Sequence, residues 1–141
     1  CGNTTAQALA LGCSFDQLTW AWLPKDCPHY TNGDFIVSEG RPWEYYEDPQ
    51  GEVIVQRESW QQVLEGERRV FAVKGEHLAH CVYNFLSLGQ IIRNNTPYPQ
   101  RLVEYMHLEH CASLILENLR LDKSWNEVQS MTGTVAYDVS C

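Results

Sequence analysis

The chain has 141 residues, 44% of them apolar, and a formal net charge of −8 at neutral pH. This length fits one domain whose core is large enough to fold without metal or cross-links. The acidic balance and the scattered Lys and Arg residues exclude the basic surface that nucleic acids and anionic membranes require. No stretch of the sequence is apolar for long enough to span a bilayer, and we expect a signal peptide or an anchor helix to have preceded Cys1.

The first part of the chain, residues 1–58, is expected to form short elements tied together by disulfides. Thr4 and Gln7 fit a capping box, and Gly12 is placed to end the helix that follows. The Trp20-Ala21-Trp22-Leu23-Pro24 run then alternates large and small residues, and turn-forming residues dominate after it. The elements expected here are a helix over 6–11, an extended segment over 14–24, a turn-rich stretch over 30–40 and a small hairpin that pairs 43–47 with 53–55.

Helical propensity dominates the second part, residues 59–121, which we expect to be the core of the protein. Ser59 is expected to cap a short helix over 60–65, and two longer helices are expected between 70 and 94 and over 102–121, joined by a proline-containing loop. The third part, residues 122–141, is a tail with a strand expected over 132–139. The predicted fold is therefore mainly α: a small disulfide-linked helical domain with an antiparallel helix pair and a minor β-hairpin.

The cysteines are even in number and spread from end to end without a C-x-x-C pair, at Cys1, Cys13, Cys27, Cys81, Cys111 and Cys141. This pattern indicates disulfides and therefore an oxidising compartment. Two N-glycosylation sequons, at Asn3 and Asn94, agree with passage through the secretory pathway. We therefore predict a secreted or lumenal glycoprotein, anchored in the membrane only if an N-terminal anchor helix is present in its precursor.

One pentapeptide pattern occurs twice, thirty residues apart, and it is the most informative feature of the sequence. It reads His-Leu-Ala-His-Cys at 77–81 and His-Leu-Glu-His-Cys at 107–111. On a helix, positions i and i+3 share a face and i+4 lies beside them. If the two helices lie antiparallel, their facing surfaces bring together four imidazoles, those of His77, His80, His107 and His110.

Such a cluster predicts a metal site, because buried imidazoles that are neither bonded nor metal-bound are costly. Four nitrogen ligands favour copper, as one ion or two, and zinc is the alternative. The alternative interpretation is a hydrogen-bonded polar seam between the two helices, without metal. Glu76, Glu104 and Glu109 are candidates for orienting the imidazole N–H groups rather than for ligation.

The cysteines that end the two motifs, Cys81 and Cys111, allow two interpretations. Equivalent positions on neighbouring antiparallel helices favour a cross-helix disulfide. Alternatively, their thiolates bind the metal. If Cys81 and Cys111 form a disulfide, the other four cysteines would tie the N-terminal arm to itself or to Cys141. The fifth histidine, His29, lies in a turn-rich stretch and is interpreted as a surface residue.

Paired HxxHC motifs on consecutive helices resemble the UstYa family of fungal oxidases, secretory-pathway enzymes of secondary metabolism and ribosomal peptide cyclisation. The resemblance covers roughly residues 70–120. It implies that the four motif histidines bind copper and that the reaction is oxidative attack on an unactivated C–H bond or a phenol. Cyclisation, desaturation, hydroxylation and halogenation are the outcomes it implies.

Two features qualify this resemblance. Family members commonly carry a Leu-Arg pair shortly after each motif, whereas this chain has Phe85-Leu86 and Ile115-Leu116, so substrate contacts do not carry over. The N-terminal part, including Leu11-Gly12-Cys13 and Trp22-Leu23-Pro24, resembles a group of uncharacterised cysteine-rich fungal proteins, often membrane-anchored, with the same HxxHC tail. That resemblance bears on the fold and on the cellular compartment of the protein, and it implies little about the reaction.

The function expected from the sequence is therefore a copper-dependent oxidase or oxygenase that acts on a peptide or polyketide-type secondary metabolite. Tyr83, Tyr105 and Trp125 are core or rim aromatics that could alternatively line the pocket or relay an electron. The rival function is a non-catalytic secreted interaction or effector module whose histidines are structural or hold zinc. No nucleic-acid partner is expected in either case.

Overall fold

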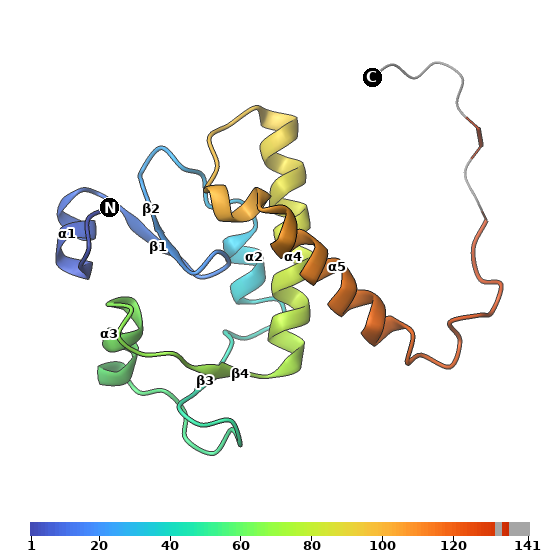
Figure 1. Cartoon of the computed structure of the whole chain (residues 1–141), viewed down its shortest axis with the longest axis horizontal. Coiled ribbons are helices and arrows are strands. Elements are labelled where there is room, and N and C mark those ends of the chain that lie inside the picture. Colours follow the sequence, from blue (N-terminus) through green and yellow to red (C-terminus); the bar gives the residue numbers. More distant parts are fainter. Residues whose placement is uncertain (132–133, 136–141) are drawn as a thin grey trace.

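A computed structural model describes residues 1–131 and 134–135 (Figure 1). Helices account for most of the regular structure, and two small antiparallel strand pairs complete it. The strand expected over 132–139 falls mostly outside the described residues, and so does Cys141. None of the described helices has both the length and the hydropathy needed to cross a bilayer.

The N-terminal arm is closed by a disulfide between Cys1 and Cys13. Between them lies helix α1 (Thr5–Ala10), and the side chain of its N-cap, Thr4, accepts a hydrogen bond from the Gln7 backbone N–H. Gly12 follows the helix at φ +74°, a conformation that glycine adopts without strain. The expected extended segment is a hairpin instead, in which β1 (Ser14–Asp16) pairs antiparallel with β2 (Ala21–Leu23).

A short helix, α2 (Asn32–Ile36), occupies the stretch where only turns were expected. Its fourth residue, Phe35, is fully buried and packs against Tyr83 of α4 (Lys74–Asn94). The Thr31 hydroxyl, just before α2, donates to the Tyr83 backbone carbonyl. Tertiary burial of one aromatic side chain therefore stabilises a segment whose local sequence favours turns.

The hairpin expected over 43–55 forms only in part. Tyr46 and Ile54 make an isolated bridge, but the longer pairing joins β3 (Tyr45–Tyr46) to β4 (Phe71–Ala72). Helix α3 (Arg57–Leu64) begins three residues earlier than expected. The expected Ser59 cap is wrong, because Gln56 is the N-cap and the Ser59 hydroxyl donates to the Glu47 carboxylate.

The two long helices of the core are α4 and α5 (Tyr105–Leu119), joined through a 3-10 turn, η1 (Gln100–Val103). They contact each other. Figure 1 shows α5 crossing α4 obliquely and leading away from it, rather than lying along its full length. The helices are therefore close where the two pentapeptides lie and diverge beyond them.

Candidate metal centre

Both pentapeptides lie in helix, His77 and His80 in the first two turns of α4 and His107 and His110 in the first two turns of α5. Val73 and Glu104 are the respective N-caps, both in extended conformation. Each motif thus begins within one turn of a helix start, and the i, i+3 spacing points both of its imidazoles toward the neighbouring helix.

The four imidazoles meet as two pairs across the helix crossing. Nε2 of His80 lies 3.4 Å from Nε2 of His107, and Nε2 of His77 lies 3.4 Å from Nε2 of His110. The ring centroids of His77 and His80 are 6.2 Å apart, so the pairs are neighbours. The structure brings together all four histidines that the sequence singled out.

The two pairs differ in burial. His80 and His107 are half-buried and form an inner pair, whereas His77 and His110 are exposed and form an outer pair. Burial is the largest cause that lowers the pKa of His77, His80 and His107. For His80, burial and the nearby His107, His77 and Arg101 lower the pKa to about 4. These three imidazoles are neutral at neutral pH, which is the state that binds metal.

The orientation of the His80 ring is fixed by its surroundings. Its ring donates a hydrogen bond to the backbone of Leu18, and its edge packs against Phe35. Asn84, one turn further along α4, holds its Nδ2 2.9 Å from His80 Nε2 and donates to the His80 carbonyl. Because the Asn84 amide nitrogen is a donor, Nε2 is the acceptor nitrogen, and a metal ion would use its lone pair in place of the Asn84 hydrogen bond.

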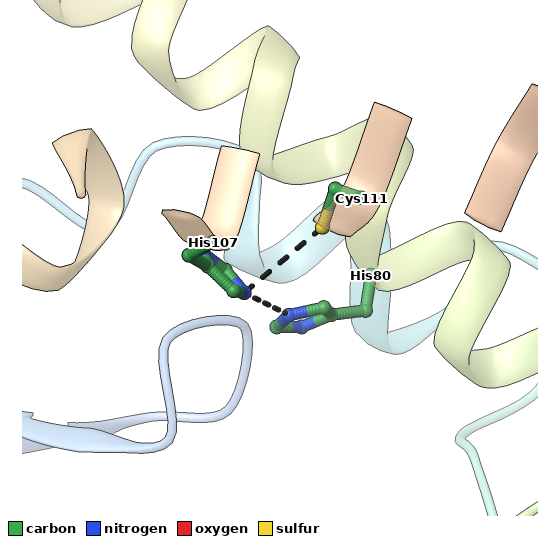
Figure 2. Close-up of side chains that lie close together, drawn as sticks. All are labelled: His80, His107 and Cys111. Atoms are coloured by element: carbon green, nitrogen blue, oxygen red, sulfur yellow. Dashed lines mark hydrogen bonds between the residues drawn. The ribbon is translucent and has the colours of Figure 1, made fainter. Parts of the chain in front are cut away.

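Cys81 and Cys111 are fully buried beside the inner pair. Figure 2 shows the Cys111 sulfur and the His80 ring both directed toward His107, and Cys111 Sγ lies 4.0 Å from His107 Nε2. Among the described residues both cysteines are free thiols, and they lie within hydrogen-bonding range of each other. Burial raises the pKa of both thiols. The cross-helix disulfide stays a prediction.

His80, His107 and Cys111 offer ligand atoms within 4.8 Å of one another, so this set can hold a metal ion. The spacing of the pairs also fits a metal. Two ligands of a tetrahedral ion with bonds of about 2.0–2.1 Å are separated by about 3.3–3.4 Å, the separation within each histidine pair.

Two buried polar atoms in this cluster, Oδ1 of Asn84 and Nδ1 of His107, have no hydrogen-bond partner among the residues that the structure describes. Unpartnered buried polar atoms are costly and uncommon in native proteins. Both residues line the same pocket as the paired imidazoles, so the cluster is incomplete as protein alone. The imidazole nitrogens present therefore fit a metal ion that brings further, non-protein ligands with it.

A pocket of about 300 Å³ opens over the cluster and is lined by all four histidines. The N-terminal arm contributes Thr19 and Trp20 to its wall, and Arg101 contributes a guanidinium. Arg101 makes no ion pair with any residue that the structure describes. The sequence indicates only a packing role for Trp20 and gives no sign of its left-handed backbone, φ +48°.

The pocket lining also includes a carboxylate, that of Glu76, which does not orient an imidazole as expected. It is buried and accepts a hydrogen bond from the Tyr45 hydroxyl at 2.9 Å. Burial raises the pKa of Glu76. Glu104 and Glu109 are exposed, and neither hydrogen-bonds to an imidazole within the described part of the chain. The Leu18 backbone takes the orienting role at His80.

The other residues singled out from the sequence lie away from the cluster. Tyr105 and Trp125 are 72% and 45% exposed, and Tyr83 packs on Phe35, as expected of rim and core aromatics. Cys27 forms no disulfide with a described residue. Asn3 and Asn94 are both exposed.

His29, which was interpreted as a surface residue, has a side chain that is 30% exposed. It is half-buried and hydrogen-bonded to two side chains, Asp16 and Ser14 of β1. These contacts join residues thirteen and fifteen positions apart, a separation at which no local pattern could have indicated them. His29 also takes no part in the metal cluster.

Comparison with known proteins adds no relative to this description: no protein-family model, no curated protein and no solved structure matches the chain.

Proposed function

We propose that this protein is a copper-dependent oxidase or oxygenase of the secretory pathway that acts on a peptide or polyketide-type secondary metabolite. The observation that carries the proposal is the pairing of four imidazoles, Nε2 to Nε2, at the floor of one pocket. Copper is favoured because imidazole suits it and because Cu(II) leads the affinity order for such sites. The resemblance of the motifs to the UstYa family points to the same metal.

In this proposal His77, His80, His107 and His110 hold the metal, as one ion or as two with one pair each. Bound copper supplies one-electron redox chemistry and activation of oxygen. The Leu18 backbone fixes the His80 ring, and Phe35 supports its edge. Since both inner imidazoles stay neutral at physiological pH, no proton has to be displaced from them before the metal binds.

The walls of the pocket suggest what the substrate offers. Arg101, which forms no ion pair within the described part of the chain, suits a carboxylate, and Trp20 gives an apolar aromatic surface against which a phenol or hydrocarbon can pack. A peptide segment or an acidic polyketide carries both groups. The Cys1–Cys13 disulfide agrees with a secretory compartment.

Oxygen uptake by the copper-loaded protein with a reductant tests this proposal. We expect catalytic uptake, and we expect the double variant His77→Ala/His107→Ala to lose it, because this variant removes one member of each pair. The folding of the variant is checked by circular dichroism. A wild-type protein that binds copper but reduces no oxygen would contradict the oxidase proposal.

One observation favours a second candidate, a secreted interaction module whose cluster holds zinc. Apolar side chains are exposed on the two core helices, among them Val82, Leu86, Ile92, Leu116 and Leu119. A partner protein could cover such a surface. Two imidazoles and a thiolate, from His80, His107 and Cys111, also suit zinc. Natively purified protein that contains zinc alone would favour this candidate.

A further inference from the structure

A second group of chemically active side chains lies outside the metal cluster, on the β1–β2 hairpin and the turn after it. Ser14 and Asp16 are two positions apart on β1 and therefore point to the same side of the strand. His29 approaches them from the segment between β2 and α2. None of the three lines the pocket over the four motif histidines.

The three side chains form a continuous hydrogen-bonded chain. Ser14 Oγ lies 2.6 Å from His29 Nε2, and His29 Nδ1 lies 2.7 Å from Asp16 Oδ2. The other carboxylate oxygen, Asp16 Oδ1, accepts from the Thr19 backbone N–H at 2.7 Å and from the Thr19 hydroxyl at 2.8 Å. Asp16 is 2% exposed, so its carboxylate is held in one orientation from both sides.

These contacts fix where the protons are when His29 is neutral. The Asp16 carboxylate can only accept, so the ring proton of His29 is on Nδ1. Nε2 is then an acceptor, and the hydrogen bond at that end runs from the Ser14 hydroxyl to the ring. This is the arrangement by which an imidazole, oriented by a carboxylate, serves as general base for a serine nucleophile.

We propose that Ser14 is a nucleophile activated by His29 and Asp16, and that it takes an acyl or phosphonyl group from an activated ester or fluoride. This site is separate from the proposed copper site, and its chemistry does not depend on copper. Ser14 is exposed, so small reagents reach it directly from solvent.

The step conserves atoms and needs no oxidant or reductant. With an activated ester, the Oγ–C bond forms, the hydroxyl proton passes to His29 Nε2, and the bond from the carbonyl carbon to the leaving oxygen breaks. The leaving group takes up the proton, and water then releases the acid and restores Ser14. With a fluorophosphonate, an Oγ–P bond forms, the hydroxyl proton passes to His29 Nε2, the P–F bond breaks, fluoride departs, and the adduct remains.

A biotinylated alkyl fluorophosphonate tests the proposal on the full chain. We expect one phosphonyl group per chain, located on Ser14 by peptide mass mapping, and no label in Ser14→Ala. Hydrolysis of p-nitrophenyl acetate is expected to fall with the same variant. Ser14 is exposed, so its replacement leaves the fold in place, which circular dichroism verifies.

The role of the base is tested with His29→Gln, which keeps the side chain polar. We expect the rate constant of labelling to fall about 100-fold, the lower end of what general-base catalysis contributes. Ser124→Ala is the matched control, because the Ser124 hydroxyl donates to the Asp122 carboxylate instead of an imidazole. This variant should be labelled at the wild-type rate.

Three results would overturn the proposal: absence of label from folded wild-type protein, label spread evenly over several serines, or an unchanged rate in His29→Gln. Each would mean that the three side chains only brace the hairpin.

Discussion

At the scale of single residues, His80 is the most tightly constrained of the motif histidines. Its ring is held by the Leu18 backbone, by Asn84 on its own helix and by Phe35 of α2. Three separate parts of the chain thus fix one imidazole. The outer histidines have fewer restraints and are exposed, so the inner pair sets the geometry of the site.

His80 also gives the metal-free protein a distinct pH dependence. Its pKa is about 4 in the folded protein, against an ordinary histidine value of 6.5 for the unfolded chain, so the folded protein binds fewer protons between these values. The contribution of His80 to the free energy of unfolding is therefore fully present above about pH 7 and decreases as the pH falls through 6.5 toward 4. Between pH 7.5 and pH 5 the decrease should be about 2 kcal/mol.

Urea unfolding of wild type and His80→Gln at these two pH values measures this term. The carboxylates titrate alike in both proteins, so the difference between their pH dependences isolates His80. If both proteins lose the same free energy of unfolding between pH 7.5 and pH 5, the imidazole is not desolvated as described.

A second prediction at this scale concerns the support of the ring. Phe35 is fully buried against His80, so Phe35→Ala should lower the free energy of unfolding by about 3–5 kcal/mol and weaken metal binding. Phe85→Ala is the matched control, since Phe85 is 36% exposed and should cost much less. Equal costs in chemical denaturation would contradict this account of the packing.

At the scale of elements, the helices that carry the motifs could be predicted because their signals are local. Helical periodicity and the repeated pentapeptide are visible without tertiary information. The elements that were missed depend on distant contacts. Helix α2 is stabilised by burying Phe35 against α4, and β3 pairs with β4, which lies about 25 residues further along the chain. A single sequence does not show such pairings.

Because α4 and α5 cross where the motifs lie, a prediction about the two motif cysteines belongs to the scale of elements. We expect Cys81 and Cys111 to form a disulfide under oxidising conditions, which closes a loop of about thirty residues. Its loss should lower the free energy of unfolding by roughly 3–4 kcal/mol. Cys81→Ser and Cys111→Ser should then be equally destabilised and should both still bind copper.

Denaturant unfolding and copper analysis of the two variants check this expectation. Loss of copper from Cys111→Ser alone would contradict the disulfide and favour a Cys111 thiolate ligand, which is the member of the pair grouped with His80 and His107. Titration of thiols in the denatured, unreduced wild type gives an independent result.

At the scale of the whole molecule, the N-terminal arm and the helical core build the pocket together. The sequence divided the chain at residue 58, yet Leu18, Thr19 and Trp20 from the arm surround the histidines of α4 and α5. The four ligand candidates could be named from the sequence because they repeat. The residues that orient and enclose them could not, because their contacts arise only when the arm folds onto the helices.

The measurement that tests the central claim most directly is electron paramagnetic resonance of the protein loaded with Cu(II). We predict stoichiometric copper with a spectrum showing nitrogen ligation, and loss of this signal in the folded variant His77→Gln/His107→Gln, which removes one member of each pair. His29→Gln, which changes the histidine outside the cluster, should bind copper as the wild type does. A folded wild-type protein that takes up no copper, or a nitrogen-ligated signal that survives in the double variant, would contradict the account.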